Sequence, residues 1–266
     1  MTAENPHGSF WDHLDILRAA IIRIIAVWGI FSIVAFVFKE QLFEFVLAPR
    51  NNDFVTYRFI GELCCNMGIE EPKPFSIQLI NTGLAQQFII HMKTALCAGI
   101  ILVAPYALYQ IFGFISPGLY CNERKYTSRL IISGYLMFLI GTSISYLVIF
   151  PMTFRFLGTY QVAGDVVNMI SLESYMGTLI IMCLCMGIVC ELPVLSWICA
   201  RMGLISAPFM AKYRKHAIVV ILIVAAIITP TSDIFTLILV SVPIWLLYEV
   251  SLLIVKRGSR NTMTTI

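Results

Sequence analysis

Two carboxylates that could do chemistry stand in strongly apolar stretches of the chain. Glu191 lies within the run Met186–Pro193, and Glu249 lies near the end of the last apolar run. An ionisable side chain at the centre of a membrane helix costs about 2.5–3.5 kcal/mol on insertion scales, which makes it a candidate for function. Pro193 also removes a backbone hydrogen bond beside Glu191. The structural alternatives are a hydrogen bond to a neighbouring helix for Glu191 and a charge that reaches the interface for Glu249.

Charged and aromatic residues also gather in two patches between or before the apolar runs. The first patch consists of Asp12, His13, Asp15 and Arg18. The second consists of Phe114, Ile115, Ser116, Pro117, Gly118, Leu119, Tyr120, Glu123, Arg124 and Lys125. An acid beside aromatic residues at a membrane face suits a peptide that is both basic and apolar. A solvated charge cluster is the alternative in both places.

Motifs of hydrolytic or nucleotide-binding membrane enzymes are absent from the sequence. It has no His-Glu-x-x-His pair, no phosphate-binding loop and no Gly-x-Ser-x-Gly elbow. The 8 cysteines show neither zinc spacing nor a disulfide framework, and the 4 histidines lie near the ends of apolar runs or in the tail. We therefore expect no enzyme activity, no metal and no cofactor.

The elements that position these residues must be helices in a bilayer, because the composition excludes a water-soluble fold. Hydrophobic residues make up 59% of the 266 residues, charged residues only 12%, and the mean hydropathy is +0.87. Soluble domains carry about 25% charged residues. The net charge of +3 gives no reason to expect a nucleic-acid partner.

Charged residues, prolines and glycines divide the chain into six apolar runs, which predict an all-α integral membrane protein with a single domain over residues 1–266. We expect spans at about 19–38, 94–114, 130–150, 176–200, 216–229 and 234–255. Pro151 is expected to end the third. The two long polar segments, 39–89 and 151–175, are expected to form caps on one side of the membrane.

The last two helices are predicted to be short. The twelve residues Ala217–Ile228 rise only about 18 Å, against a hydrocarbon core of about 30 Å. In the sixth run the uninterrupted apolar stretch ends before Glu249. Such helices would thin the bilayer beside them. A re-entrant hairpin is the alternative for this pair.

Basic residues predict the orientation of the bundle. Twelve of the 18 Lys and Arg residues fall on the side of the termini, five fall on the side of the two polar segments, and Lys93 stands at an entrance. Because cytoplasmic segments are enriched in Lys and Arg, both termini are expected in the cytoplasm and the polar segments outside it. The N-terminus lacks the basic leader of a cleaved signal peptide, so the first span is expected to be retained.

The order of the motifs resembles the TatC subunit of the twin-arginine protein translocase over nearly the whole chain. The matching pieces are His13-Leu14-x-x-Leu17-Arg18, Ala48-Pro49, Pro105-x-x-x-Tyr109-Gln110-x-x-x-Phe114-Ile115-Ser116-Pro117-Gly118-Leu119-Tyr120-x-x-Glu123-Arg124, Phe150-Pro151, Glu191-Leu192-Pro193, Thr229-Pro230 followed by Asp233, and Pro243 with Tyr248-Glu249. Each piece is short, but their order in a chain with six predicted spans is specific.

The resemblance implies a receptor that exports folded proteins across the bacterial cytoplasmic membrane, driven by the proton-motive force. It implies single-span partners of the TatA and TatB type, twin-arginine signal peptides of folded cargo, membrane lipid, and a homo-oligomer within a larger complex. The residues it implies for signal-peptide binding are Glu123, Phe114, Arg18, His13, Asp15 and Pro117. The residues it implies for assembly or for function inside the membrane are Glu191, Pro49, Gln110, Asp233 and Glu249, although Asp233 is first expected to cap the sixth helix.

The sequence departs from the family pattern in two places. Ile16 stands where the family has a glutamate, and Asp15 is displaced from that position by about 100° on a helix. The first polar segment, with Cys64-Cys65 and Glu70-Glu71-Pro72-Lys73-Pro74, is longer than usual. Two other function classes stay open. One is a proton-coupled transporter that titrates Glu191 and Glu249, although no internal repeat supports it. The other is a membrane scaffold without cargo specificity.

Overall fold

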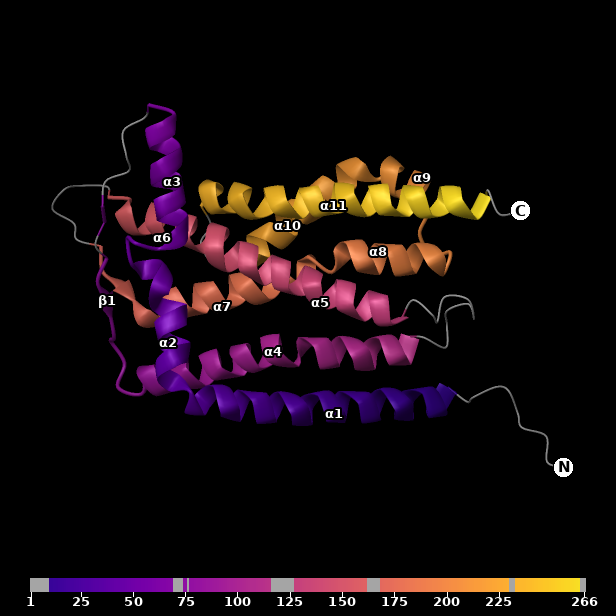
Figure 1. Cartoon of the computed structure of the whole chain (residues 1–266), viewed down its shortest axis with the longest axis horizontal. Helices are drawn as coiled ribbons and strands as arrows, with labels where there is room; N and C mark the ends of the chain where they lie inside the picture. The colour runs from indigo at the N-terminus through magenta and orange to yellow at the C-terminus, as the bar shows by residue number, and fades with distance from the viewer. Residues whose placement is uncertain are drawn as a thin grey trace.

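The computed structural model describes residues 10–68, 74–75, 77–115, 127–161, 168–229 and 233–263, most of them in helices. The helices that form the bundle are α1 (Phe10–Val37), α4 (Gln86–Ile115), α5 (Thr127–Ile144), α7 (Leu172–Val189), α8 (Leu192–Arg201), α10 (Arg214–Ile228) and α11 (Ile234–Met263). Helix α1 packs on α4, α4 on α5, and α5 on α7, while α11 packs on α8 and α10. Figure 1 shows these helices running along the long axis, from α1 on one side to α11 on the other.

The remaining elements gather at one end of the bundle, with the exception of α9 (Ala207–Lys212). They are α2 (Lys39–Leu47), a 3₁₀ turn at Ala48–Arg50, α3 (Val55–Asn66), β1 (Leu79–Ile80), α6 (Phe150–Thr159) and β2 (Ile170–Ser171). We call this end the cap. The two strands pair in parallel, with Leu79 opposite Ile170, and so tie the two long polar segments together. The start of α1 and the end of α11 lie at the opposite end, which we call the terminal end (Figure 1).

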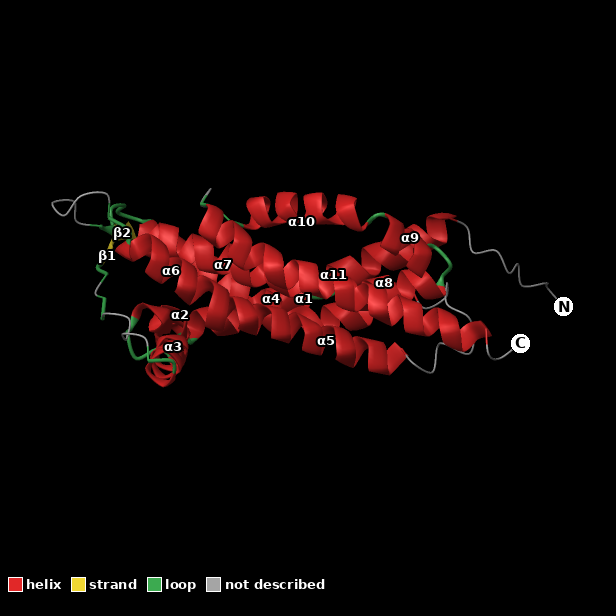
Figure 2. Ribbon diagram, turned by 90° about the horizontal axis from the view of Figure 1, so that it is seen from above, coloured by secondary structure: helices red, strands yellow, loops and turns green. Residues whose placement is uncertain are grey.

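Five helices within the described residues are long and apolar enough to cross a membrane. Their spans are Leu14–Val37, Gln86–Phe114, Leu130–Thr159, Leu172–Arg201 and Ile234–Arg257. Helix α10 has 15 residues and rises about 22 Å, so it is short, as expected for the fifth run. It runs along one face of the bundle (Figure 2).

The prediction of a short sixth helix is wrong. Helix α11 has 30 residues and continues past both Pro243 and Glu249. It can do so because the Glu249 carboxylate pairs with the Arg214 guanidinium of α10 at 2.8 Å, so the charge does not have to end the helix. The uninterrupted apolar stretch therefore underestimates the length of the span.

The prediction that Pro151 ends the third helix is also wrong. Helix α5 continues through a π-helical turn at Ser145–Ile149 into α6, with Pro151 in the first turn of α6. Proline lacks an N–H group and cannot bond the carbonyl four residues earlier, which is that of Leu147. The Thr56 hydroxyl of α3 donates to the Leu147 carbonyl instead. The fold thus supplies from the cap the hydrogen bond that the helix loses.

Three tyrosine hydroxyls fasten the end of α2 to the rest of the cap. The hydroxyl of Tyr175 donates to the Val46 carbonyl at 3.1 Å, and that of Tyr146 donates to the Phe45 carbonyl. The hydroxyl of Tyr57 lies 3.1 Å from the Pro49 carbonyl and 3.0 Å from that of Pro151. The last carbonyls of a helix lack some partners within the helix, and these hydroxyls add hydrogen bonds from other elements of the cap; the Phe45 carbonyl also accepts from the Ala48 N–H.

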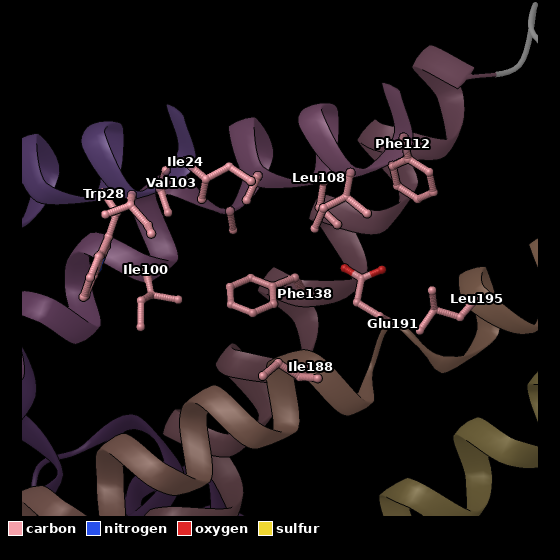
Figure 3. A pocket seen from close by; sticks show the side chains of 14 residues that line it. Ile24, Trp28, Ile100, Val103, Leu108, Phe112, Phe138, Ile188, Glu191 and Leu195 are labelled. Carbon is pink, nitrogen blue, oxygen red and sulfur yellow. The ribbon is translucent and has the colours of Figure 1, made fainter. Parts of the chain in front are cut away.

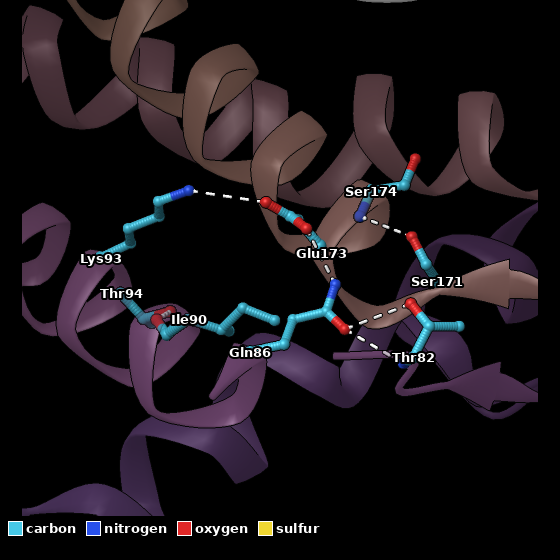
Figure 4. Close-up of polar contacts among 8 residues, drawn as sticks. All are labelled: Thr82, Gln86, Ile90, Lys93, Thr94, Ser171, Glu173 and Ser174. Atoms are coloured by element: carbon cyan, nitrogen blue, oxygen red, sulfur yellow. Dashed lines mark hydrogen bonds and ion pairs between the residues drawn. The ribbon is translucent and has the colours of Figure 1, made fainter. Parts of the chain in front are cut away.

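The cap is also joined to the starts of α4 and α7 by side chains (Figure 4). The Gln86 carbonyl oxygen accepts from the backbone N–H groups of Thr82 and Gly83 at 3.1 and 3.0 Å, and its amide donates to Glu173 at 2.8 Å. Lys93 lies 3.8 Å from the same carboxylate. Because Lys93 and Glu173 are more than half exposed, their pairing contributes at most about 1 kcal/mol.

Candidate functional site

Glu191 lies in a break between α7 and α8. Helix α7 ends at Val189 because Pro193 has no N–H group to donate to the Val189 carbonyl, and Pro193 then occupies the first turn of α8. The Glu191 N–H donates to the Ile188 carbonyl at 3.1 Å, and the Glu191 carbonyl accepts from Leu195 at 2.9 Å. The span expected at 176–200 is therefore divided into α7 and α8. The break between them sets the position of the Glu191 side chain.

The Glu191 carboxylate is buried, and one of its oxygens has no partner within the described residues. Its residue is 9% exposed, and Oε1 has no hydrogen-bond partner among the residues that the structure describes. It lies against α5, where a Cβ atom added to Gly134 would stand 3.1 Å from Oε2 and 3.4 Å from Leu108 of α4. A buried carboxylate without a donor is costly. The site therefore retains capacity to accept a hydrogen bond from a ligand.

This carboxylate lines a cavity of about 480 Å³ between α1, α4, α5, α7 and α8. Every other lining residue is apolar; six of them are Trp28, Ile100, Leu108, Phe112, Phe138 and Leu195. In Figure 3 the carboxylate points toward α4, between Leu108 and Phe112. Ligand pockets commonly have about 300–1,000 Å³ and a few polar groups on apolar walls. An apolar segment that carries a hydrogen-bond donor would fit this cavity.

The residues expected to bind a signal peptide are only partly described. Helices α1 and α4 pack side by side in opposite directions, so the first turns of α1 and the last turn of α4 lie together at the terminal end (Figure 1). This places Asp15 and Arg18, both exposed, at the same end of the molecule as the half-buried Phe114. Glu123, Pro117 and the side chain of His13 lie outside the described residues.

Two further candidates have structural partners. The Gln110 amide donates to the hydroxyl of Tyr106, one turn earlier in α4, at 2.7 Å. Asp233 Oδ2 accepts from the backbone N–H of Thr236 at 2.7 Å, so Asp233 caps α11, the structural role expected from its position. Pro49 is fully buried in the 3₁₀ turn of the cap.

Glu249 and Glu191 have different surroundings. Glu249 pairs with Arg214 and joins α11 to α10, and it is not among the residues that line the Glu191 cavity. A proton-coupled transporter that titrates these two groups together gains no support from this arrangement.

Three residues that shape the cavity had no motif to mark them. Trp28 is held in place by its indole N–H, which donates to the Leu96 carbonyl of α4 at 2.9 Å. Phe138 forms a wall, and Gly134 makes room for the Glu191 carboxylate. Of these three residues only Gly134 had a signal in the sequence, because a glycine in an apolar span is a position where helices can approach closely.

Comparisons with known proteins identify the family. A family model described as "Sec-independent protein translocase protein (TatC)" matches residues 12–243. The chain belongs to the TatC family. It is 33% identical over 253 residues to the Sec-independent protein translocase protein TatC of Desulforapulum autotrophicum, a match that covers 95% of this chain and 86% of that protein. The TatC of a Blattabacterium species is 31% identical, and the match covers 96% and 97%.

Solved structures match the TatC-family fold as well. A crystal structure titled as the twin arginine translocase receptor TatC superimposes with a TM-score of 0.75 at 27% identity, covering 93% of this chain and 99% of that one. A second crystal structure of that receptor, in the detergent DDM, gives a TM-score of 0.76. This TatC-family chain is therefore a membrane protein of the twin-arginine protein-transport system.

Proposed function

We propose that this chain is the receptor subunit of the translocase and binds twin-arginine signal peptides at its terminal end. The observation that carries this proposal is the family match over residues 12–243, together with the structural likeness to a protein titled a twin arginine translocase receptor. It acts by binding and by assembly rather than by catalysis. It exports folded proteins together with partners of the TatA and TatB type, as a homo-oligomer within a larger complex, and draws on the proton-motive force.

The terminal end faces the cytoplasm in this proposal, with α10 as a sixth span. Six spans place both termini on one side of the bacterial inner membrane. Positive charge supports this orientation, because Lys and Arg residues are enriched in cytoplasmic segments. The basic residues on the described parts of this end include Arg18, Arg201, Lys212, Arg214, Lys215, Lys256 and Arg257.

Glu123 is the residue to which we assign the signal arginines, with Phe114, Arg18, His13, Asp15 and Pro117 as its neighbours in the site. A carboxylate accepts two parallel hydrogen bonds from one guanidinium, and a lysine ammonium cannot reproduce that fork. Hydrogen bonds to charged groups contribute about 1.5–3 kcal/mol. Loss of one such contact should weaken peptide binding about tenfold or more.

The test is photo-crosslinking of a signal peptide to the membrane-embedded chain, with Arg-Arg and Lys-Lys peptides compared side by side. We expect labelling near Glu123 with the Arg-Arg peptide alone, and its loss in Glu123→Gln. The control is Glu44→Gln, since Glu44 is exposed on α2 at the cap. Equal labelling by both peptides would instead indicate a scaffold without cargo specificity, and unchanged binding by Glu123→Gln would remove the assignment.

Glu191 has a later role in this proposal, after the signal peptide is recognised. The unpaired carboxylate oxygen and the apolar walls of its cavity support a role in receiving an apolar segment of the signal peptide or of a partner. Glu191→Ala should bind the signal peptide normally but export poorly. Export at the wild-type rate with Glu191→Ala, at equal protein level, would exclude the role.

Helix α10 is the edge at which we propose that single-span partners dock. It is too short for a bilayer core of about 30 Å, and a shorter helix thins the membrane beside it. Its exposed side chains include Val220 and Ile227. Cysteines in partner spans should crosslink to cysteines at these two positions. Crosslinks found only at Ile132 or Leu136 of α5, which are also exposed, would contradict the proposal.

A further inference from the structure

Helix α3 of the cap carries an exposed apolar face that nothing in the described chain covers. Val55, Phe59, Leu63 and Met67 follow one another at intervals of four residues and are 67%, 64%, 48% and 66% exposed. Each interval rotates the side chain by only about 40°, so the four form one stripe. Arg58 and Glu62, both exposed, lie beyond Val55 on the side of the helix away from Met67, and Asn66 falls between Val55 and Phe59.

The stripe faces toward the membrane. Helix α3 stands across the long axis of the bundle and projects beyond its side in Figure 1, and it is seen almost end-on in Figure 2. On the helix surface Thr56 falls between Leu63 and Met67. The Thr56 hydroxyl donates to the Leu147 carbonyl, which belongs to the membrane-spanning helix. The face of α3 that bears the stripe therefore looks along the spans rather than away from them.

The lipid-facing surface of the bundle continues to the base of this stripe. Leu147 and Val148 are 39% and 42% exposed and belong to the span Leu130–Thr159. Exposed apolar side chains on a membrane span contact lipid, and Thr56 joins the stripe directly to them. A helix with one apolar and one polar face that lies flat at this level matches the pattern of an interfacial membrane helix.

We infer that α3 lies flat on the bilayer surface at the cap end, beside the bundle, with its apolar stripe in the boundary between headgroups and acyl chains. Phospholipid is the occupant of the stripe. Because Tyr57 of the same helix is bonded into the cap, this contact fixes the depth of the cap in the membrane. The inference does not depend on what the chain transports or on which side of the membrane the cap lies.

The test uses the full chain in vesicles of phosphatidylethanolamine and phosphatidylglycerol. A photoreactive benzoyl-phenylalanine is placed at Phe59 or Leu63 in the stripe. The matched control is Arg58, which lies about 100° from Phe59 and about 140° from Leu63 around the helix. All three positions are exposed, so the substitutions should leave the fold intact. We expect phospholipid adducts by mass spectrometry at Phe59 and Leu63 and none at Arg58.

Two results would overturn the inference. Equal lipid labelling at Phe59, Leu63 and Arg58 would mean that the stripe does not face the bilayer. A crosslink from Phe59 or Leu63 to a second copy of the chain, without a lipid adduct, would mean that the stripe is a contact between subunits.

Discussion

Substitution of Gly141 by alanine should destabilise the bundle, because α5 and α7 approach each other at this residue without room for a side chain. A Cβ atom on Gly141 would lie 2.5 Å from the Met186 carbonyl oxygen and 2.7 and 2.8 Å from Sγ and Cβ of Cys190. Real Cβ atoms essentially never come closer than 3.0 Å to such atoms. The Met186 carbonyl cannot rotate away, since it belongs to the backbone and accepts from the Cys190 N–H at 2.9 Å. Helix α7 would have to move, and with it the break that positions Glu191.

The expected loss follows from the cost of forcing extra volume into a packed core, about 1–3 kcal/mol. For a chain of this size each kcal/mol lowers Tm by about 2–4 °C, so Gly141→Ala should lower Tm by roughly 2–12 °C. A fluorogenic thiol reagent can follow thermal unfolding of the purified protein in detergent. Cys97, Cys183 and Cys190 are buried, so they should react as the bundle opens.

Gly177→Ala is the matched control on α7. A Cβ atom at Gly177 meets nothing within 4 Å, and alanine is favoured over glycine within a helix by about 1 kcal/mol. This variant should unfold at the wild-type temperature or slightly above it. An unchanged Tm for Gly141→Ala, or an equal fall for both variants, would refute the reasoning from close helix packing.

Four further predictions concern the contacts of three residues. Tyr57→Phe should lower the free energy of unfolding by about 1–3 kcal/mol, because its hydroxyl bonds cap carbonyls, whereas the exposed Tyr160 should tolerate the same change. Burial raises the pKa of Tyr57 above its ordinary 10.0, and Arg155 opposes the rise. The neutral tyrosine therefore contributes its full stabilisation below pH 10, and this stabilisation is lost as pH rises through the raised pKa. In alkaline unfolding curves Tyr57→Phe should lose less stability with rising pH than the wild type. Asp233→Ala should cost about 0.5–2 kcal/mol through loss of the helix cap, and a Tm equal to that of wild type would contradict it. Glu249→Gln should change the free energy of unfolding by at most about 1 kcal/mol because its partner is half exposed, and a larger fall in Tm would mean that the charge is structurally essential.

Much of the fold could be predicted from apolar runs, because a bilayer requires each long apolar run to form a helix that satisfies its own backbone. Five such helices are found within the described residues, and α10 is short as expected. The helix ends were less predictable. Pro151 does not end its helix and Glu249 does not shorten α11, because Thr56 and Arg214 supply the missing partners from elsewhere in the chain.

The candidate site was also predictable only in part. A carboxylate in an apolar run next to Pro193 marked Glu191 in the sequence, since both the charge and the missing N–H group are costly in a membrane. The cavity around Glu191 could not be predicted, because its walls come from five helices and its space depends on Gly134 and Trp28.

The sequence by itself determined the membrane class, the order of the helices and the position of Glu191, all of which follow from the local cost of placing each residue in lipid. The tertiary structure alone decided which groups meet. The Tyr57 and Thr56 hydroxyls reach backbone carbonyls far along the chain, and the stripe on α3 acquires a direction only once its helix is fixed to the cap. Hydrogen bonds and packing between distant segments depend on how the helices are arranged in space, and no local pattern of residues encodes that arrangement.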